Sequence, residues 1–291
     1  MTTVDLERAE RLPDDHAAER GRNGVVLFSK RFRHGWLIEA MLIAGVGYAY
    51  ETIRNLVMGS AHTALRDAKV LTRIEVAMGI YHERAFQHLF LDWPFVVGLW
   101  NFYYDTAHFL VPTFVAIYLY TTAPERYRRA RNAFFFMLLG VAHLAWLVFP
   151  ITPPKYMPAS YGFHDTQVEY WNVGPKKAIA YTKDGEPQQA VVDAVGNLYG
   201  GLPSHHVSWS LWAVVALWPV LRKRWTKALL VLHPILTMAA ITVTGNHRFV
   251  DALGSIVEVA VAFGLAIALE RLLARRRGHT AGMRTRSPAA V

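Results

Sequence analysis

The sequence predicts an all-α, polytopic membrane protein, a bundle of six transmembrane helices with both termini in the cytoplasm. Hydrophobic residues make up 53% of the 291 positions, and they fall in long runs rather than at the scattered positions of a soluble core. Short basic clusters separate these runs. Only helices and closed β-barrels satisfy their backbone in lipid, and the runs are too long and continuous for the alternating pattern of a barrel.

Six apolar runs approach the roughly 20 residues that a helix needs to cross the hydrocarbon core. The fourth and fifth runs are short, which suits helices whose outer ends carry polar functional residues at the lipid interface. We expect a membrane catalytic domain at 31–273 between cytoplasmic tails at 1–30 and 274–291. The six runs are 36–57, 94–120, 132–150, 206–221, 228–245 and 250–272.

The basic residues predict the orientation of these spans. The net charge is +9, but the charge is concentrated in four clusters that fall on one side of a six-span protein. The positive-inside rule assigns that side to the cytoplasm, so the surplus meets anionic lipid headgroups and not nucleic acid. We therefore expect an integral protein of a bacterial plasma membrane. The clusters lie at 30–33, 126–131, 222–227 and 271–277.

Three connections then face outward. Residues 58–93 contain an amphipathic stretch at 71–90 that is predicted to lie along the interface. The longest loop, 151–205, is predicted to be functional, with Lys176 and Lys177 on a solvated face. The third connection is the short turn 244–251, and the chemistry is expected on this outer side.

His247 stands four residues before Asp251 in this turn. If residues 247–251 are helical, the imidazole and the carboxylate share one face. The carboxylate would then hold one ring nitrogen and leave the other free as a nucleophile. The chain has no cysteine, so a thiolate nucleophile or thiolate metal site is excluded.

The fourth run begins with Pro203, Ser204, His205 and His206. Ser204 is the predicted helix N-cap, and the unpaired N–H groups of the first turn offer a site for phosphate. Lys155, at the start of the long loop, brings a cation to the same side.

The second run contains Asn101, Tyr104 and His108, which line one stripe of a helix. Polar residues inside a span normally face the bundle or a watery cavity. Substrate contact and a structural interhelical network both fit these three residues. His143 and His233 belong to no motif and are interpreted as structural.

The segments "PSHH" (203–206) and "HRFVD" (247–251) resemble two signature motifs of the type 2 phosphatidic acid phosphatase superfamily. Over residues 75–260 the wider pattern resembles one branch, the inositol phosphorylceramide synthase-like proteins. That pattern consists of "NFYYDTAH" (101–108), "GFHDT" (162–166), "NLYGGLPSHHVSW" (197–209) and "TGNHRFVD" (244–251).

The resemblance implies a metal-independent lipid phosphatase or phosphotransferase with a phosphohistidine intermediate and no cofactor. His247 matches the nucleophile and Asp251 the carboxylate that orients it. His206 matches the general acid, although His205 stands beside it as an alternative. Lys155 lies near the position of a basic phosphate ligand.

The chain departs from the superfamily pattern before the nucleophile, where a Ser-Arg pair is usual. Ala240 and Ile241 occupy those places, so one expected phosphate ligand is missing. Arg248 is a candidate to supply the charge instead. The branch resemblance implies transfer of a headgroup such as phosphoinositol to a lipid alcohol.

Three alternatives remain open at this stage. The first is a plain phosphatase for lipid phosphates or polyprenyl (di)phosphates, with water as the acceptor. The second is a non-enzymatic lipid carrier or transporter, which paired inverted repeats would favour. The third is a zinc site, for which the candidate ligands are His205, His206, His247 and Asp251.

Overall fold

The structure is a computed structural model that describes residues 15–57, 59–171 and 199–284. Lys176, Lys177 and the outer parts of both predicted tails therefore lie outside the described residues. Contacts divide the chain into two units, Met1–Tyr48 and Ala49–Val291. The first unit contains the beginning of the long helix α1, Asp15–Leu56. All of the candidate site residues belong to the second unit.

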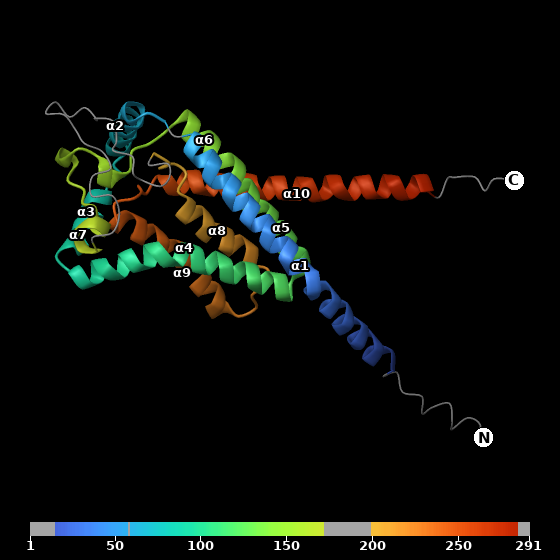
Figure 1. The fold of residues 1–291 in the computed structure, drawn as a ribbon. Coiled ribbons are helices and arrows are strands. Elements are labelled where there is room, and N and C mark those ends of the chain that lie inside the picture. The colour runs from blue at the N-terminus through green and yellow to red at the C-terminus, as the bar shows by residue number, and fades with distance from the viewer. Residues whose placement is uncertain (1–14, 58, 172–198, 285–291) are drawn as a thin grey trace, which may run out of the picture. The chain divides into compact units, whose positions relative to one another are not determined.

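The all-α prediction is confirmed for the described residues, which contain helices and no strand (Figure 1). A short π-helical turn, Met137–Val141, joins α5 to α6, so these form one continuous helical stretch. Two 3₁₀ turns, Pro154–Tyr156 and Ala159–Tyr161, punctuate the loop that follows. The remaining helices are α2 (Ala61–Ala77), α3 (Glu83–Leu91), α4 (Pro94–Thr122), α5 (Pro124–Phe136), α6 (Ala142–Val148), α7 (Thr166–Trp171), α8 (His205–Leu217), α9 (Arg224–Val243) and α10 (Asp251–Arg284).

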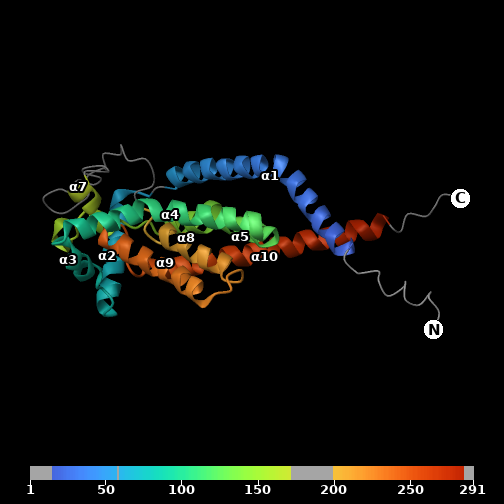
Figure 2. The same ribbon diagram turned by 90° about the horizontal axis from the view of Figure 1, so that it is seen from below.

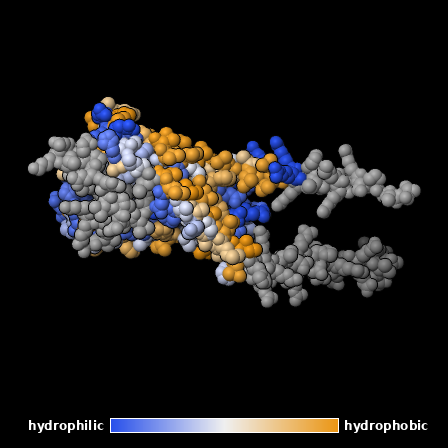
Figure 3. Space-filling view, turned by 45° about the horizontal axis from the view of Figure 1, so that its top comes forward, coloured by the Kyte–Doolittle hydropathy of each residue, from blue (hydrophilic) through white to orange (hydrophobic). Residues whose placement is uncertain are grey.

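Within the described residues, three helical stretches are long and apolar enough to cross a membrane: Pro124–Val148, Arg224–Val243 and Asp251–Arg276. Large apolar side chains on them are exposed, including Ile235 and Ile256. Figure 3 shows hydrophobic residues, in orange, over the middle of this face, with hydrophilic residues, in blue, gathered toward its two ends. These features indicate an integral membrane protein. The six-span count and the orientation stay predictions.

The helices of the second unit pack closely around a core that contains many small residues. Helix α10 packs against α5 and α8, and α4 packs against α8 and α9. Short side chains let helix backbones approach closely in a membrane protein. Buried alanines therefore recur at these contacts, namely Ala130, Ala133, Ala213, Ala216, Ala262 and Ala266.

Helices α2, α3 and α7 gather at one end of the second unit (Figures 1 and 2). The amphipathic stretch 71–90, expected as a single interfacial segment, is divided between α2 and α3. The chain breaks at Gly79, whose φ of 71° is a conformation that glycine adopts without steric cost. Leu65, Ala68 and Leu71 of α2 form a second apolar cluster with Ile151 and Met157 of the long loop. This cluster fixes α2 beside the loop that leads to the site.

Candidate active site

The turn between α9 and α10 brings His247 and Asp251 together. Nδ1 of His247 lies 3.0 Å from Asp251 Oδ2 and 3.0 Å from the Gly201 carbonyl oxygen. Both partners are acceptors, so Nδ1 carries the proton. Nε2 makes no hydrogen bond to any residue that the structure describes. The predicted contact and the predicted turn are both present, and they need no helix at residues 247–250, because Asp251 is the first residue of α10.

Gly245 determines how closely the long loop approaches this turn. Its φ is 69°, and a Cβ there would lie 2.8 Å from the His164 carbonyl oxygen and 3.0 Å from Lys155 Cβ. Glycine is therefore required for both conformation and space. The Gly245 carbonyl accepts a hydrogen bond of 2.8 Å from the Lys155 N–H. The predicted cation is thus anchored two residues from His247 in the turn sequence.

Helix α8 begins at His205, with Ser204 as its N-cap residue, as predicted. The side chain of Ser204 does not make the expected capping bond, and its Oγ is buried without a partner among the described residues. The two adjacent histidines point to different surroundings. His205 Nε2 lies 3.2 Å from Glu258 Oε1, and its Nδ1 lies 3.1 Å from the Tyr50 hydroxyl. His205 therefore belongs to a buried polar cluster inside the bundle.

His206 faces the turn that contains His247. Its ring centroid is 5.7 Å from that of His247. The ring stacks on Tyr104 at 4.4 Å and meets His108 edge-on at 4.5 Å. His108 Nδ1 donates to the Tyr104 carbonyl at 2.6 Å, which fixes its ring. Two members of the predicted α4 stripe thus hold His206 in place.

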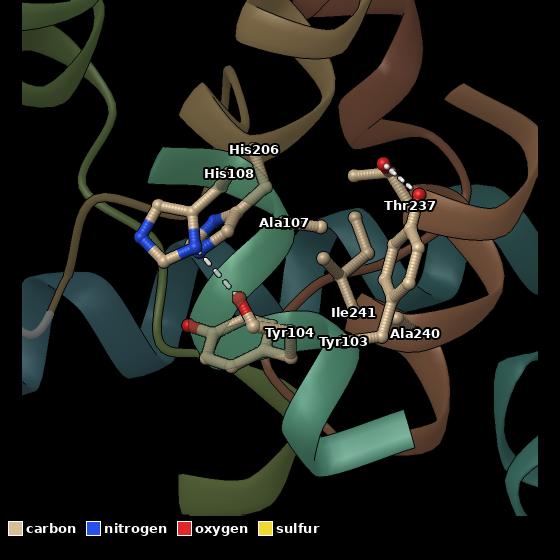
Figure 4. Close-up of a pocket in the computed structure, with 8 residues that line it drawn as sticks. All are labelled: Tyr103, Tyr104, Ala107, His108, His206, Thr237, Ala240 and Ile241. Atoms are coloured by element: carbon tan, nitrogen blue, oxygen red, sulfur yellow. Dashed lines mark hydrogen bonds between the residues drawn. The ribbon is translucent and has the colours of Figure 1, made fainter. Parts of the chain in front are cut away.

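A small pocket opens beside His206, between α4 and α9 (Figure 4). His108 and His206 lie on one side of it, while Ala240 and Ile241 of α9 lie on the other. Ala240 and Ile241 are the two positions at which the sequence departs from the expected Ser-Arg pair. The α9 side of this pocket consists of Thr237, Ala240 and Ile241, and it carries no cation.

Asn101, the third member of the α4 stripe, has a different environment. Its side chain exchanges two hydrogen bonds with Thr166, one to the carbonyl and one from the hydroxyl. Asn101 is fully buried. It joins α4 to the start of α7 and thereby holds the "GFHDT" segment against the bundle.

Lys155 supplies a buried cation beside the turn. Nζ donates to Gln167 Oε1 at 3.0 Å and lies 3.5 Å from Asp165 Oδ1. Gln167 in turn donates to Asp105 at 2.9 Å and receives a 3.4 Å hydrogen bond from Asn246. Burial lowers the pKa of Lys155, while Asp165 and Asp105 oppose that shift.

Arg248 has contacts different from those of Lys155. Its side chain is 1% exposed, with Nε 3.5 Å from Glu75 Oε2. Nη2 donates to Thr72 Oγ1 at 3.3 Å, and Nη1 to the Thr152 carbonyl at 3.4 Å. In this arrangement the guanidinium lies against α2, where Glu75, Thr72 and the Thr152 carbonyl contact it.

Three buried polar residues lie behind the turn that no sequence motif indicates, namely Glu75, Glu83 and Gln87. They lie in the amphipathic stretch 71–90, where acidic residues suggest a solvated face. Only the packing of α2 and α3 against the turn shows that they are enclosed. Among the residues that the structure describes, no three His, Asp or Glu side chains form a group suited to a metal ion.

The fold and the site define an all-helical membrane protein with a His–Asp pair, a second histidine and a buried lysine around the turn between α9 and α10. A family model described as the PAP2 superfamily matches residues 69–265, which is more than half of the chain. The chain therefore belongs to the PAP2 superfamily, and this membership suggests phosphatase-type activity on lipid phosphates. No curated protein and no solved structure matched the chain.

Proposed function

We propose that this protein is a membrane phosphotransferase that moves a phosphate-containing group from a lipid through a phosphohistidine on His247. One observation carries the proposal. The Nδ1–H of His247 is held by Asp251 and by the Gly201 carbonyl, which leaves Nε2 as the nucleophilic nitrogen beside His206.

In the first half-reaction Nε2 of His247 attacks phosphorus, and a P–N bond forms as the P–O bond to the leaving group breaks. Protonated His206 gives its proton to the departing oxygen. The Asp251 carboxylate stabilises the positive charge that develops on the His247 ring. Its second contact, a 2.9 Å hydrogen bond from the Arg248 N–H, fixes the carboxylate in place.

In the second half-reaction His206 takes a proton from the acceptor hydroxyl, whose oxygen attacks phosphorus and releases His247. Water as acceptor gives a phosphatase, and an alcohol gives a transferase. Lys155 and the first-turn N–H groups of α8 are the proposed ligands of the non-bridging phosphate oxygens. Arg248 is excluded from this role in the proposal because its guanidinium contacts Glu75 and Thr72.

The charge of the site favours a phosphodiester substrate over a phosphomonoester. A monoester near neutral pH carries close to two negative charges, and a diester carries one. A hydrogen bond to a charged group contributes about 1.5–3 kcal/mol, so the apolar Ile241 weakens dianion binding by roughly one to two orders of magnitude. Lys155 already has Asp165 as a partner, which reduces its excess charge further. A phospholipid headgroup with one negative charge, such as that of phosphatidylinositol, matches the small positive charge of this site.

A panel of lipids tests the proposal. Purified protein is given phosphatidylinositol, with and without a lipid alcohol, and separately phosphatidate or a polyprenyl diphosphate. Free phosphate and new lipid products are both measured, with His247→Ala as the inactive control and a chelator arm to test the zinc alternative. Headgroup transfer from the diester supports the proposal. Fast phosphate release from phosphatidate, without transfer from the diester, would identify a plain lipid phosphatase.

A further inference from the structure

The back of the catalytic turn rests on polar groups that no signature motif includes. Glu83 and Gln87 of α3 are 0% exposed, and Glu75 of α2 is 1% exposed. Glutamates are almost never fully buried unless they are paired, because a buried carboxylate is costly without partners. Glu83 and Gln87 each hydrogen-bond to the backbone in or beside the turn, and Glu75 lies beside the Arg248 guanidinium without a hydrogen bond to it.

Helix α3 holds the backbone on both sides of His247. Glu83 Oε1 accepts a hydrogen bond of 2.9 Å from the N–H of Phe249, two residues after the nucleophile. Gln87 Nε2 donates a hydrogen bond of 2.9 Å to the carbonyl of Val243, the last residue of α9. The polypeptide between these two contacts contains His247.

Helix α2 reaches the same turn through Arg248. Glu75 Oε2 lies 3.5 Å from Arg248 Nε, and Thr72 accepts from the same guanidinium. The Arg248 N–H donates to Asp251 Oδ2, the oxygen that also holds His247 Nδ1. A displacement of Arg248 therefore moves the carboxylate that orients the nucleophile.

We propose that Glu83 and Glu75 are positioning residues that hold the His247–Asp251 pair in its reactive geometry, Glu83 through the Phe249 N–H and Glu75 through the Arg248 side chain. This inference rests on the proposed role of His247. Neither glutamate contacts the reacting atoms. Each acts on the turn from behind, so its loss lowers kcat rather than substrate binding.

The charge around Glu75 adds a pH dependence to this arrangement. Burial raises the pKa of Glu75 to about 8, against the opposing effect of Arg248 and with the help of Glu83 and Asp251. Tyr81 is a further titratable group that interacts with it. Because this pKa lies above its ordinary value, Glu75 is mostly neutral below pH 7 and ionised above pH 9, where its attraction to Arg248 is strongest.

Two conservative variants of Glu83 test the backbone contact. Glu83→Gln loses the charge but keeps an oxygen at the distance of Oε1, while Glu83→Asp keeps the charge and withdraws the oxygen by one methylene. We expect Glu83→Gln to retain kcat within about threefold. Glu83→Asp should lose up to about 10²-fold with little change in KM, because misplacement of reacting groups by about 1 Å has effects of that size. Asp67→Asn, a buried carboxyl variant of α2 that contacts Arg66, is the matched control.

Equal kcat values for Glu83→Asp, Glu83→Gln and wild type would overturn the backbone part of the proposal. For Glu75 the readout is the pH profile of Glu75→Gln, which imitates the neutral side chain. Its kcat should match that of wild type below pH 7. Above pH 9 its kcat should be at least about threefold lower than that of wild type, and parallel pH profiles of the two proteins would contradict the role of Glu75. His247→Ala in the same assay distinguishes failure of the proposed function from failure of the positioning role. If it is active, the proposed function fails, whereas an inactive His247→Ala beside a fully active Glu83→Asp refutes only the positioning role.

Discussion

Replacing Asp251 with asparagine tests the orienting role of the carboxylate with minimal change of shape. Asp251 is 1% exposed, and its Oδ2 receives hydrogen bonds from His247 Nδ1 and the Arg248 N–H. An asparagine oxygen can accept the same two bonds, so the change removes mainly the negative charge. A hydrogen bond to a charged group contributes about 1.5–3 kcal/mol and a neutral one about 0.5–1.5 kcal/mol, so the two bonds together weaken by about 2–3 kcal/mol. With about 1.4 kcal/mol for each factor of ten, kcat should fall roughly 30- to 150-fold.

A second contact of His247 limits this loss. The Gly201 carbonyl also accepts from Nδ1 at 3.0 Å, so the tautomer with Nε2 free persists in Asp251→Asn. The loss should therefore be smaller than the roughly 10⁴-fold seen when a catalytic histidine takes the wrong tautomer. The assay is steady-state turnover of the lipid substrate by purified protein, with Asp67→Asn as a control for a buried carboxyl. A kcat within twofold of wild type would show that the charge of Asp251 does not assist His247.

Three further predictions follow from the positions of His205, His206, Lys155 and Ser160. His206→Asn should lower kcat by about 10²–10⁴-fold, the usual contribution of proton transfer. His205→Asn, which loses contacts with buried groups of the bundle, should lower the Tm more than kcat, and the reverse pattern would exchange their roles. Because burial lowers the pKa of Lys155, the KM of wild type should rise with pH at values below the ordinary lysine pKa of about 10.4. Lys155→Met should show a raised KM without this rise. Ser160→Cys, at an exposed position of the long loop, should react with an impermeant thiol reagent in intact cells, and labelling only after lysis would place the site in the cytoplasm.

The sequence predicted the parts of the site that depend on local spacing. The positions of α4, α8, α9 and α10, and the contact of His247 with Asp251, follow from hydrophobic runs and from residues four apart. The connection 244–251 is a turn, as predicted, and α10 begins only at Asp251, so the pair meets at 3.0 Å without the helical geometry considered for residues 247–251.

Other features depend on tertiary packing and were not readable from the sequence. Two adjacent histidines look equivalent in a motif, and only the neighbouring Glu258 and Tyr104 show that His205 and His206 face different surroundings. The sequence offers Arg248 as a candidate phosphate ligand, and it does not reveal that α2 places Glu75 beside the guanidinium. The branch of the superfamily and the six-span count stay predictions, because the family match and the helix lengths support only the coarser statements.

The most direct test of the central claim is chemical trapping of the phosphoenzyme. Wild-type protein is mixed with a substrate radiolabelled at phosphorus, quenched within milliseconds and digested, and the labelled peptide is identified. We expect an alkali-stable, acid-labile label on His247, its absence in His247→Ala, and its accumulation in His206→Asn if proton transfer to the acceptor is slowed. Label on another residue, or turnover by His247→Ala at a rate close to wild type, would show that His247 is not the nucleophile.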